Sequence, residues 1–190
     1  MEKIITRESS SAGISRNNSF AEQLLAAGRY KAVCVGADGQ IKWEDTFDNL
    51  VMTAGKNDLL DKYLGGTAVA AWYMGLVDNT SFSAYAAGDV LSSHAGWLEV
   101  VTGYNYSGSS TNRATVAWNA ASGGAKASTA TAFSITGTIT VLGCLLCTTQ
   151  ARNTTTNGGA GVLLSAGSFS GGARSLVNGD TLNVTYTLTV

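Results

Sequence analysis

The last ten residues of the chain, 181–190, alternate without exception between apolar and polar side chains. Threonine or asparagine fills the odd positions, and the apolar residues are Leu182, Val184, Tyr186, Leu188 and Val190. Because successive side chains of a strand point to opposite faces of a sheet, this period of two predicts a strand with one buried and one solvated face. The C-terminal segment therefore indicates a chain that folds around a β-sheet.

Similar signals recur along the chain between turns rich in Gly, Asn or Ser. We expect further strands at 30–35, 40–47, 70–77, 97–101, 113–119, 130–136, 139–149 and 161–169, with a possible bulge at Gly143. The first two form a hairpin around the turn 36–39, with Ile41, Trp43 and Phe47 sharing one face. Strands at this spacing predict a mainly β fold, an antiparallel β-sandwich or jelly roll.

Two short helices are expected beside the strands. The first, 20–27, follows a capping box formed by Ser19 and Glu22, and Gly28 fits the position just after its end. The second, 57–64, has Asn57 as its cap and ends at Gly65 and Gly66. Each is too short to be stable alone, so each must bury an apolar stripe. The stripes are Phe20, Leu24 and Leu25 in the first, and Leu59, Leu60, Tyr63 and Leu64 in the second. One further capped helical turn is expected at 89–94.

The chain length of 190 residues fits one domain with an appended arm. We divide it into an N-terminal arm with its short helix, 1–29, and a β domain, 30–190. Residues 1–18 are polar without any sustained period. They would be ordered either by a neighbouring molecule or by packing on their own domain. We predict that Lys3, Arg7, Arg16 and Phe20 contact a partner protein.

Charge is spread unevenly along the chain. Seventeen charged side chains fall within residues 1–62, and the last 128 residues carry only eight. A soluble monomer usually has a mixed charged surface, so this region indicates either a threonine-faced β domain or a surface buried in an assembly. There is no proline to protect edge strands, and an edge paired with another subunit would not need that protection.

The same composition argues against several classes of protein. The formal net charge of −1 does not fit a basic nucleic-acid binder, and three cysteines do not make a disulfide framework. No apolar run is long enough to span a membrane, and the first residues lack the apolar stretch of a secretion signal. We therefore expect no nucleic-acid or membrane partner and synthesis in a cytoplasm.

Three groups of residues could carry chemistry, and each has a simpler interpretation. Cys144 and Cys147 have CxxC spacing, but in a strand their sulfurs point to opposite faces, which predicts buried small hydrophobic residues. His94 could act with Asp89 and Ser92 or Ser93, yet no nucleophile elbow accompanies it, so a turn or interface role is favoured.

The third group, Glu44, Asp45 and Asp48 beside Trp43, could bind a cation or a sugar. A solvated strand face is the favoured interpretation. The Gly-rich segments 36–39 and 158–161 match no phosphate-binding loop and are interpreted as turns. We therefore predict no catalytic residues, no metal site and no cofactor.

A set of segments carries a resemblance to a known family. They are GADGQIKWEDT at 36–46, GKNDLLDKYL at 55–64, WYMGL at 72–76, AGDVLSSHAGW at 87–97, ASGGAKA at 121–127 and GDTLNVTYTL at 179–188. In this order the chain resembles, over residues 30–190, small virion structural proteins of tailed bacteriophages. No catalytic residues are known to us in that family, so none are carried over.

The resemblance implies a β protein associated with a phage capsid or tail. The expectation that follows is a capsid cement or decoration protein on the capsid surface. It would stabilise the shell as a homo-oligomer that contacts the major capsid protein. The alternative is a collar or tail fibre-associated protein that anchors a fibre or binds a receptor. That alternative predicts exposed aromatic side chains in a groove, at Trp72, Tyr104, Tyr106 and Trp118.

Overall fold

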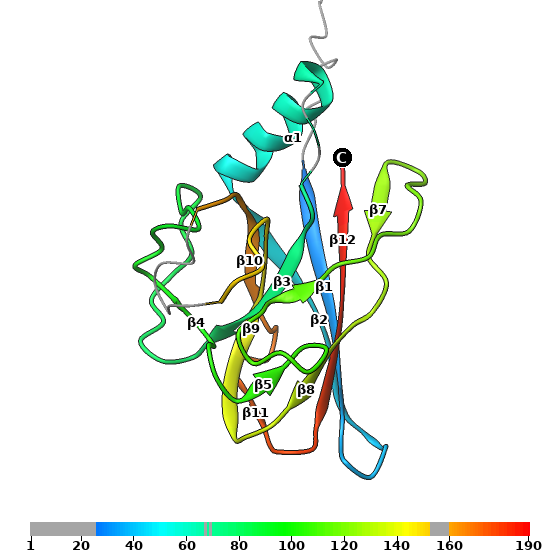
Figure 1. Ribbon diagram of the computed structural model, residues 1–190, viewed down its shortest axis with the longest axis vertical. Helices are drawn as coiled ribbons and strands as arrows, with labels where there is room; N and C mark the ends of the chain where they lie inside the picture. Colours follow the sequence, from blue (N-terminus) through cyan, green and yellow to red (C-terminus); the bar gives the residue numbers. More distant parts are fainter. Residues whose placement is uncertain (1–25, 67, 69, 153–159) are drawn as a thin grey trace, which may run out of the picture.

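The computed structural model describes residues 26–66, 68, 70–152 and 160–190. It is a mainly β protein with an antiparallel, curled sheet, shown in Figure 1. The strands are β1 Ala27–Val35, β2 Ile41–Val51, β3 Tyr73–Asp78, β4 Leu98–Glu99, β5 Tyr104–Asn105, β6 Ala114–Thr115, β7 Ala125–Ala127, β8 Thr131–Ile135, β9 Ile139–Cys147, β10 Leu163–Ser168, β11 Arg174–Leu176 and β12 Thr181–Thr189. The helix is α1, Thr53–Gly65. The prediction of a mainly β, antiparallel fold is confirmed.

The main path of hydrogen-bonded strands runs β4-β3-β9-β10-β2-β1-β12-β8-β5. Three short strands pair outside this path, β11 with β9, β6 with β3 and β7 with β12. The predicted hairpin 30–47 is present as β1 and β2, joined by a turn in which Gly39 has φ +79°. A side chain would disfavour that conformation, which explains the glycine.

The concave side of the curled sheet holds the main hydrophobic core. Strands β1, β8 and β12 contribute every second residue to it, as their alternating sequences predict. Tyr30 of β1 pairs with Tyr186 of β12, and their ring centroids lie 4.7 Å apart. The strand predicted at 181–190 is confirmed over Thr181–Thr189, with Leu182, Val184 and Tyr186 buried. Its predicted face is wrong at the end, because Leu188 is half-buried and Val190 is exposed.

A second hydrophobic cluster covers the other face of β3, β9 and β10. It contains Leu142, Leu145, Cys147, Leu163 and Ala166 from the strands, and Leu91 and Trp97 from the segment between β3 and β4. These strands are therefore buried on both faces, which explains why β9 is almost continuously apolar. The expected irregularity near Gly143 is present. The register shifts between Val77 and Asp78 opposite Gly143 and Val141, so that Leu142 bulges from the ladder.

The helix predictions needed more correction than the strand predictions. The helix predicted at 57–64 begins earlier, at Thr53, and its N-cap is Met52 instead of Asn57. Met52 is fully buried and its N–H donates to the Leu164 carbonyl at 2.8 Å, so the core anchors the start of the helix. The end at Gly65 and Gly66 is confirmed, since Gly66 adopts the left-handed conformation.

Three further helix predictions were wrong or untested. The stripe predicted to be buried is wrong in part, because Leu60, Tyr63 and Leu64 are exposed. The helix predicted at 20–27 lies mostly outside the described residues, and Ala27 and Gly28 at its end belong to β1. The described residues thus hold one helix instead of two. No helical turn forms at 89–94, where Val90 and Ser93 make an isolated β-bridge instead.

Candidate functional site

The four predicted partner contacts, Lys3, Arg7, Arg16 and Phe20, lie outside the described residues. The boundary between arm and domain can be compared only at its edge: β1 starts at Ala27, within the predicted arm 1–29. The candidate site must therefore be sought on the β domain and its helix.

The charge-poor region from Tyr63 onward exposes even less charge than its sequence indicates. Half of its eight charged side chains are buried, namely Glu99, Arg113, Arg152 and Asp180. Asp78, Asp89 and Arg174 are half-buried, and Lys126 is exposed. The surface contributed by this region consequently consists mainly of small and uncharged side chains, many of them Thr, Ser, Ala and Gly.

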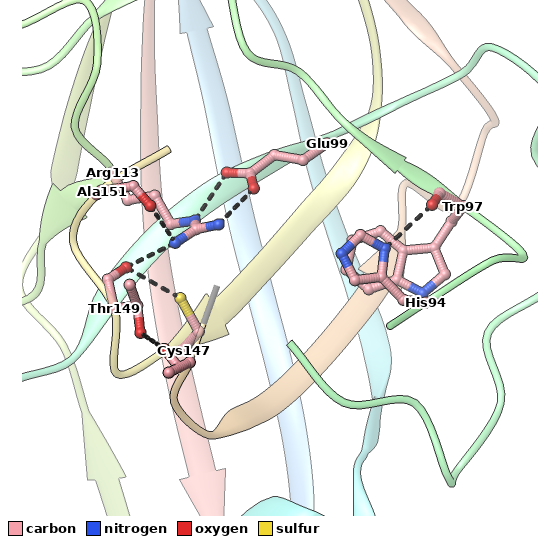
Figure 2. Close-up of polar contacts among 8 residues, drawn as sticks. His94, Trp97, Glu99, Arg113, Cys147, Thr149 and Ala151 are labelled. Atoms are coloured by element: carbon pink, nitrogen blue, oxygen red, sulfur yellow. Dashed lines mark hydrogen bonds and ion pairs between the residues drawn. The ribbon is translucent and has the colours of Figure 1, made fainter. Parts of the chain in front are cut away.

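The largest buried polar arrangement is an ion pair between Glu99 of β4 and Arg113, just before β6. Figure 2 shows its bidentate geometry, with Arg113 Nε donating to Glu99 Oε1 at 2.8 Å and Nη2 to Oε2 at 2.6 Å. The remaining amino group, Nη1, donates to the carbonyls of Thr149 and Ala151 at 2.7 and 2.8 Å. One guanidinium thereby ties the ends of β4, β6 and β9 together.

A second guanidinium lies next to this pair. Arg152 is stacked on the Tyr104 ring, with Cζ 3.7 Å from the ring centroid, and its Nη2 donates to the carbonyls of Tyr104 and Ser110. Burial raises the pKa of Glu99 above its ordinary value, and the hydrogen bonds and charges of Arg113, with the charge of Arg152, oppose that rise. The cluster holds loops in place, since Arg113 and Nη2 of Arg152 bond to main-chain carbonyls on either side of it.

His94 is buried beside this cluster and is held by Trp97. Its ring stacks on the indole with a centroid separation of 3.8 Å, and Nδ1 lies 3.1 Å from the Trp97 carbonyl oxygen (Figure 2). Since a carbonyl only accepts, Nδ1 carries the proton. Burial lowers the pKa of His94, while the main-chain hydrogen bond opposes that shift. His94 is therefore neutral near pH 7.

Asp89 does not orient His94. Its carboxylate instead accepts hydrogen bonds from Trp97 Nε1 at 2.9 Å and from the Ala86 N–H at 3.0 Å. Histidine and aspartate thus each bind Trp97 or the main chain. This arrangement fits the interpretation of His94 as a turn residue. The contacts of His94 and Asp89 with Trp97 also hold together the segment that covers the second hydrophobic cluster.

The two cysteines of the CxxC spacing lie on opposite faces of β9, as predicted. Cys144 belongs to the main core and Cys147 to the second cluster, and both thiols are free and fully buried. Burial raises the pKa of the Cys147 thiol to about 11. Their complete burial fits the interpretation as buried hydrophobic residues.

The acidic group beside Trp43 divides between the two faces of β2. Glu44 and Asp48 are exposed and pair with Lys31 and Arg29 of β1. Asp45 is buried, against our prediction of a solvated face for the group. It accepts a hydrogen bond from Ser170 and lies 3.5 Å from Arg174, whose guanidinium also covers the Trp43 ring. The tertiary fold brings 170–174 over β2, and that contact buries Asp45.

Asp180 is a second buried carboxylate that the sequence analysis did not single out. It accepts hydrogen bonds from Lys42 Nζ at 2.8 Å and from the Val177 N–H at 3.0 Å. Burial opposes its ionisation, but these hydrogen bonds outweigh burial and lower its pKa. One sequence signal could have identified these buried charges. Each is a single charged residue within an otherwise apolar or small-residue segment, and this holds for Glu99, Arg113, Arg152 and Asp180.

The aromatic residues expected in a groove by the alternative function do not form an exposed set. Tyr104 is fully buried, and Trp72, Tyr106 and Trp118 are partly buried against the main core. Their packing is that of core-lining side chains.

An apolar groove does occur elsewhere, between α1 and the ends of β1 and β12. It has a volume of about 480 Å³ and is lined by Ala26, Leu59, Leu60, Tyr63, Leu188 and Val190, together with Lys56. In Figure 1, α1 extends from the upper end of the sheet near the C-terminus of β12. Tyr63 is 87% exposed and the neighbouring Leu64 is 76% exposed, so this end of α1 presents large apolar side chains to solvent.

Two searches for other kinds of site were negative within the described ranges. No group of three or more His, Cys, Asp or Glu side chains there could hold a metal ion. No helix in the same part of the chain is long and apolar enough to cross a membrane. Comparison with family models, with curated proteins and with solved structures found no match to this chain.

Proposed function

We propose that this chain is a virion structural protein of a tailed bacteriophage, most specifically a capsid cement or decoration protein. The observation that carries the proposal is the nearly uncharged surface contributed by residues 63–190, where half of the few charges are buried. Such a surface suits permanent contact with other subunits better than it suits an isolated monomer. The proposal also draws on the resemblance described above for residues 30–190.

The mechanism we propose is mechanical. Flat strands with short side chains allow close contact with the major capsid protein and with other copies of this chain. Contact area added between capsid subunits raises the free energy needed to separate them. Lys3, Arg7 and Arg16 would extend from the domain and contact a neighbouring subunit, which adds reach and avidity. Phe20, the fourth predicted contact, stands closest in sequence to the domain.

The architecture we propose for this role is a β-sandwich of the jelly-roll type. Its support is that strands from both halves of the curled sheet, such as β1 and β9, face one shared core. Two layers packed in this way present two broad outer faces, one of them polar. A protein that bridges capsid subunits needs such a pair of stiff, opposed surfaces.

The first test is the number of copies of this chain in purified virions, measured by gel densitometry against the major capsid protein. A ratio near one, or a simple fraction of it, supports a cement protein spread over the shell. About a dozen copies would contradict that role and favour the collar or tail fibre alternative, in line with a position at a single vertex. Absence from the virion would reject both.

The second test addresses the arm. Deleting residues 1–18 is expected to abolish capsid binding while the β domain keeps its fold by circular dichroism. A matched variant replaces Lys3, Arg7 and Arg16 with glutamine and keeps the length of the arm. Loss of binding in both variants would assign the contact to charge, whereas unchanged capsid occupancy after the deletion would overturn the proposed role of the arm.

A further inference from the structure

Helix α1 is attached to the domain by its first turns only. Met52 is buried, and Gly55 packs so closely on Leu164 that a side chain at this position would clash with the Leu164 backbone. Farther along the helix, Leu60, Tyr63 and Leu64 are 50%, 87% and 76% exposed. A helix of 13 residues is marginal in water unless packing holds it, so its exposed apolar side chains require a partner.

The groove next to these side chains is lined by two separate parts of the chain. Leu59, Leu60 and Tyr63 come from α1, while Leu188 and Val190 come from the end of the chain at β12. The remaining apolar lining residue is Ala26, which immediately precedes β1. Its volume of about 480 Å³ is in the range of pockets that bury a small ligand or a few side chains.

The position of Ala26 identifies an occupant. Twenty-five residues precede it, and the nearest of them carry the apolar side chains Phe20, Leu24 and Leu25. Ala26 itself lines the groove, so the described part of the chain begins there, and residues 20–25 directly precede it in sequence. Six residues reach about 20 Å when extended and about 9 Å as a helix, lengths comparable to the groove wall formed by α1.

Charge is also complementary. Glu22 is the charged residue of the segment 20–25, and Lys56 is the charged residue of the groove. A segment that is covalently attached next to its site has a high effective concentration there, whereas a second copy would pay the entropy of association. These observations favour the chain's own segment over another molecule.

We propose that residues 20–25 dock into the groove of their own chain, with Phe20, Leu24 and Leu25 covering the apolar face of α1. The inference goes beyond the proposed function, because it concerns the isolated protein and holds whether or not the chain belongs to a virion. It assigns Phe20 to the domain instead of to a partner.

A spin label close to the segment tests this directly. The three native cysteines are buried, so a nitroxide will react with the thiol introduced by Asn18→Cys. In the isotope-labelled full chain, docking is expected to broaden the amide signals of Leu60, Tyr63 and Val190. In a second sample, one chain carries the spin label without isotopes and is mixed with a chain that carries isotopes without the spin label. Broadening in this mixture reports only on contacts between copies, and we expect none.

Two pairs of variants make the result specific. Tyr63→Asp, in the groove, is expected to abolish the broadening, and Leu64→Asp, which changes an exposed side chain that does not line the groove, is expected to preserve it. Because Tyr63→Asp could also weaken α1, Leu24→Asp tests the other partner, with Gln23→Asp as its control. No broadening in the parent, broadening only in the mixed sample, or equal behaviour within both pairs would overturn the proposal.

Discussion

The two halves of the curled sheet differ in whether one or both faces of their strands are buried. In β1, β2 and β12, buried residues alternate with exposed or half-exposed Thr, Lys, Glu and Asp. In β3, β9 and β10, nearly every residue is buried, because a second hydrophobic cluster covers their outer face. Both halves share one core on the concave side. The difference therefore lies entirely in what covers the outside.

The cover comes from the long connection between β3 and β4. Phe82 and Tyr85 pack on the second cluster, Trp97 lies at its centre, and Asp89 and His94 hold Trp97 in place. The half without such a cover keeps a polar outer face. The comparison predicts that substitutions will have large effects in the covered half and small ones in the open half.

The largest effect is expected at the buried ion pair. Glu99→Gln leaves Arg113 and Arg152 without a counter-charge inside the protein, so it should lower the free energy of unfolding by about 3–5 kcal/mol in urea titrations. The double variant Glu99→Leu/Arg113→Met removes both charges of the pair and is expected to recover only part of this loss, because Arg152 keeps its charge and the carbonyls of Thr149 and Ala151 lose their donor. A single variant as stable as the parent would show that the pair does not anchor the covered half.

The next effect concerns the outer layer itself. Leu145→Ala removes a fully buried side chain from the second cluster and should destabilise the protein by about 3 kcal/mol. Thr46→Ala, on the exposed face of β2, should change the free energy of unfolding by less than about 0.5 kcal/mol. Equal losses in these two variants would contradict the asymmetry between the halves.

A smaller effect should appear as a dependence on pH. The pKa of His94 is lowered in the folded protein, so the unfolded chain takes up the proton first as the pH falls below about 6.5. Stability should therefore decrease from pH 7.5 to 5.5, with a slope no steeper than about 1.4 kcal/mol per pH unit.

His94→Phe is the control for this titration. It keeps the stack on Trp97 and should flatten the pH profile in the same window. Asp45 and Asp180 have lowered pKa values and titrate below that window. Glu99 has a raised pKa and would change stability in the opposite direction, so the contribution of His94 is the difference between the profiles of His94→Phe and the parent. A profile that keeps its slope in His94→Phe would assign the dependence to another group.

The smallest effect is expected for an ion pair of the open half. Arg29 Nε lies 2.8 Å from Asp48 Oδ1, the same separation as in the buried pair, but both side chains are well exposed. Solvent and salt screen such a pair, so Asp48→Asn should leave the urea midpoint of unfolding unchanged. A loss approaching that of Glu99→Gln would show that burial does not control the strength of these bridges.

Prediction from sequence succeeded where the signal was local. The alternation in 181–190 defined the strand and its buried face as far as Tyr186, and the strand environment of Cys144 and Cys147 placed their thiols on opposite faces. Prediction failed for α1, where Asn57 looked like a cap but burial of Met52 and the contact of Gly55 with Leu164 set the start. The apolar stripe of that helix was predicted to be buried, but Leu60, Tyr63 and Leu64 are exposed.

The sequence alone determined that this chain forms an antiparallel β protein and that charge is scarce after Tyr63, because alternation and composition are properties of neighbouring residues. Only the tertiary structure decided that Glu99 meets Arg113, that Asp45 is buried beneath Arg174, and that Ala26 shares a groove with α1 and the end of β12. These contacts join segments far apart in the chain. Their partners depend on strand order and on how the sheet curls, which no local pattern encodes.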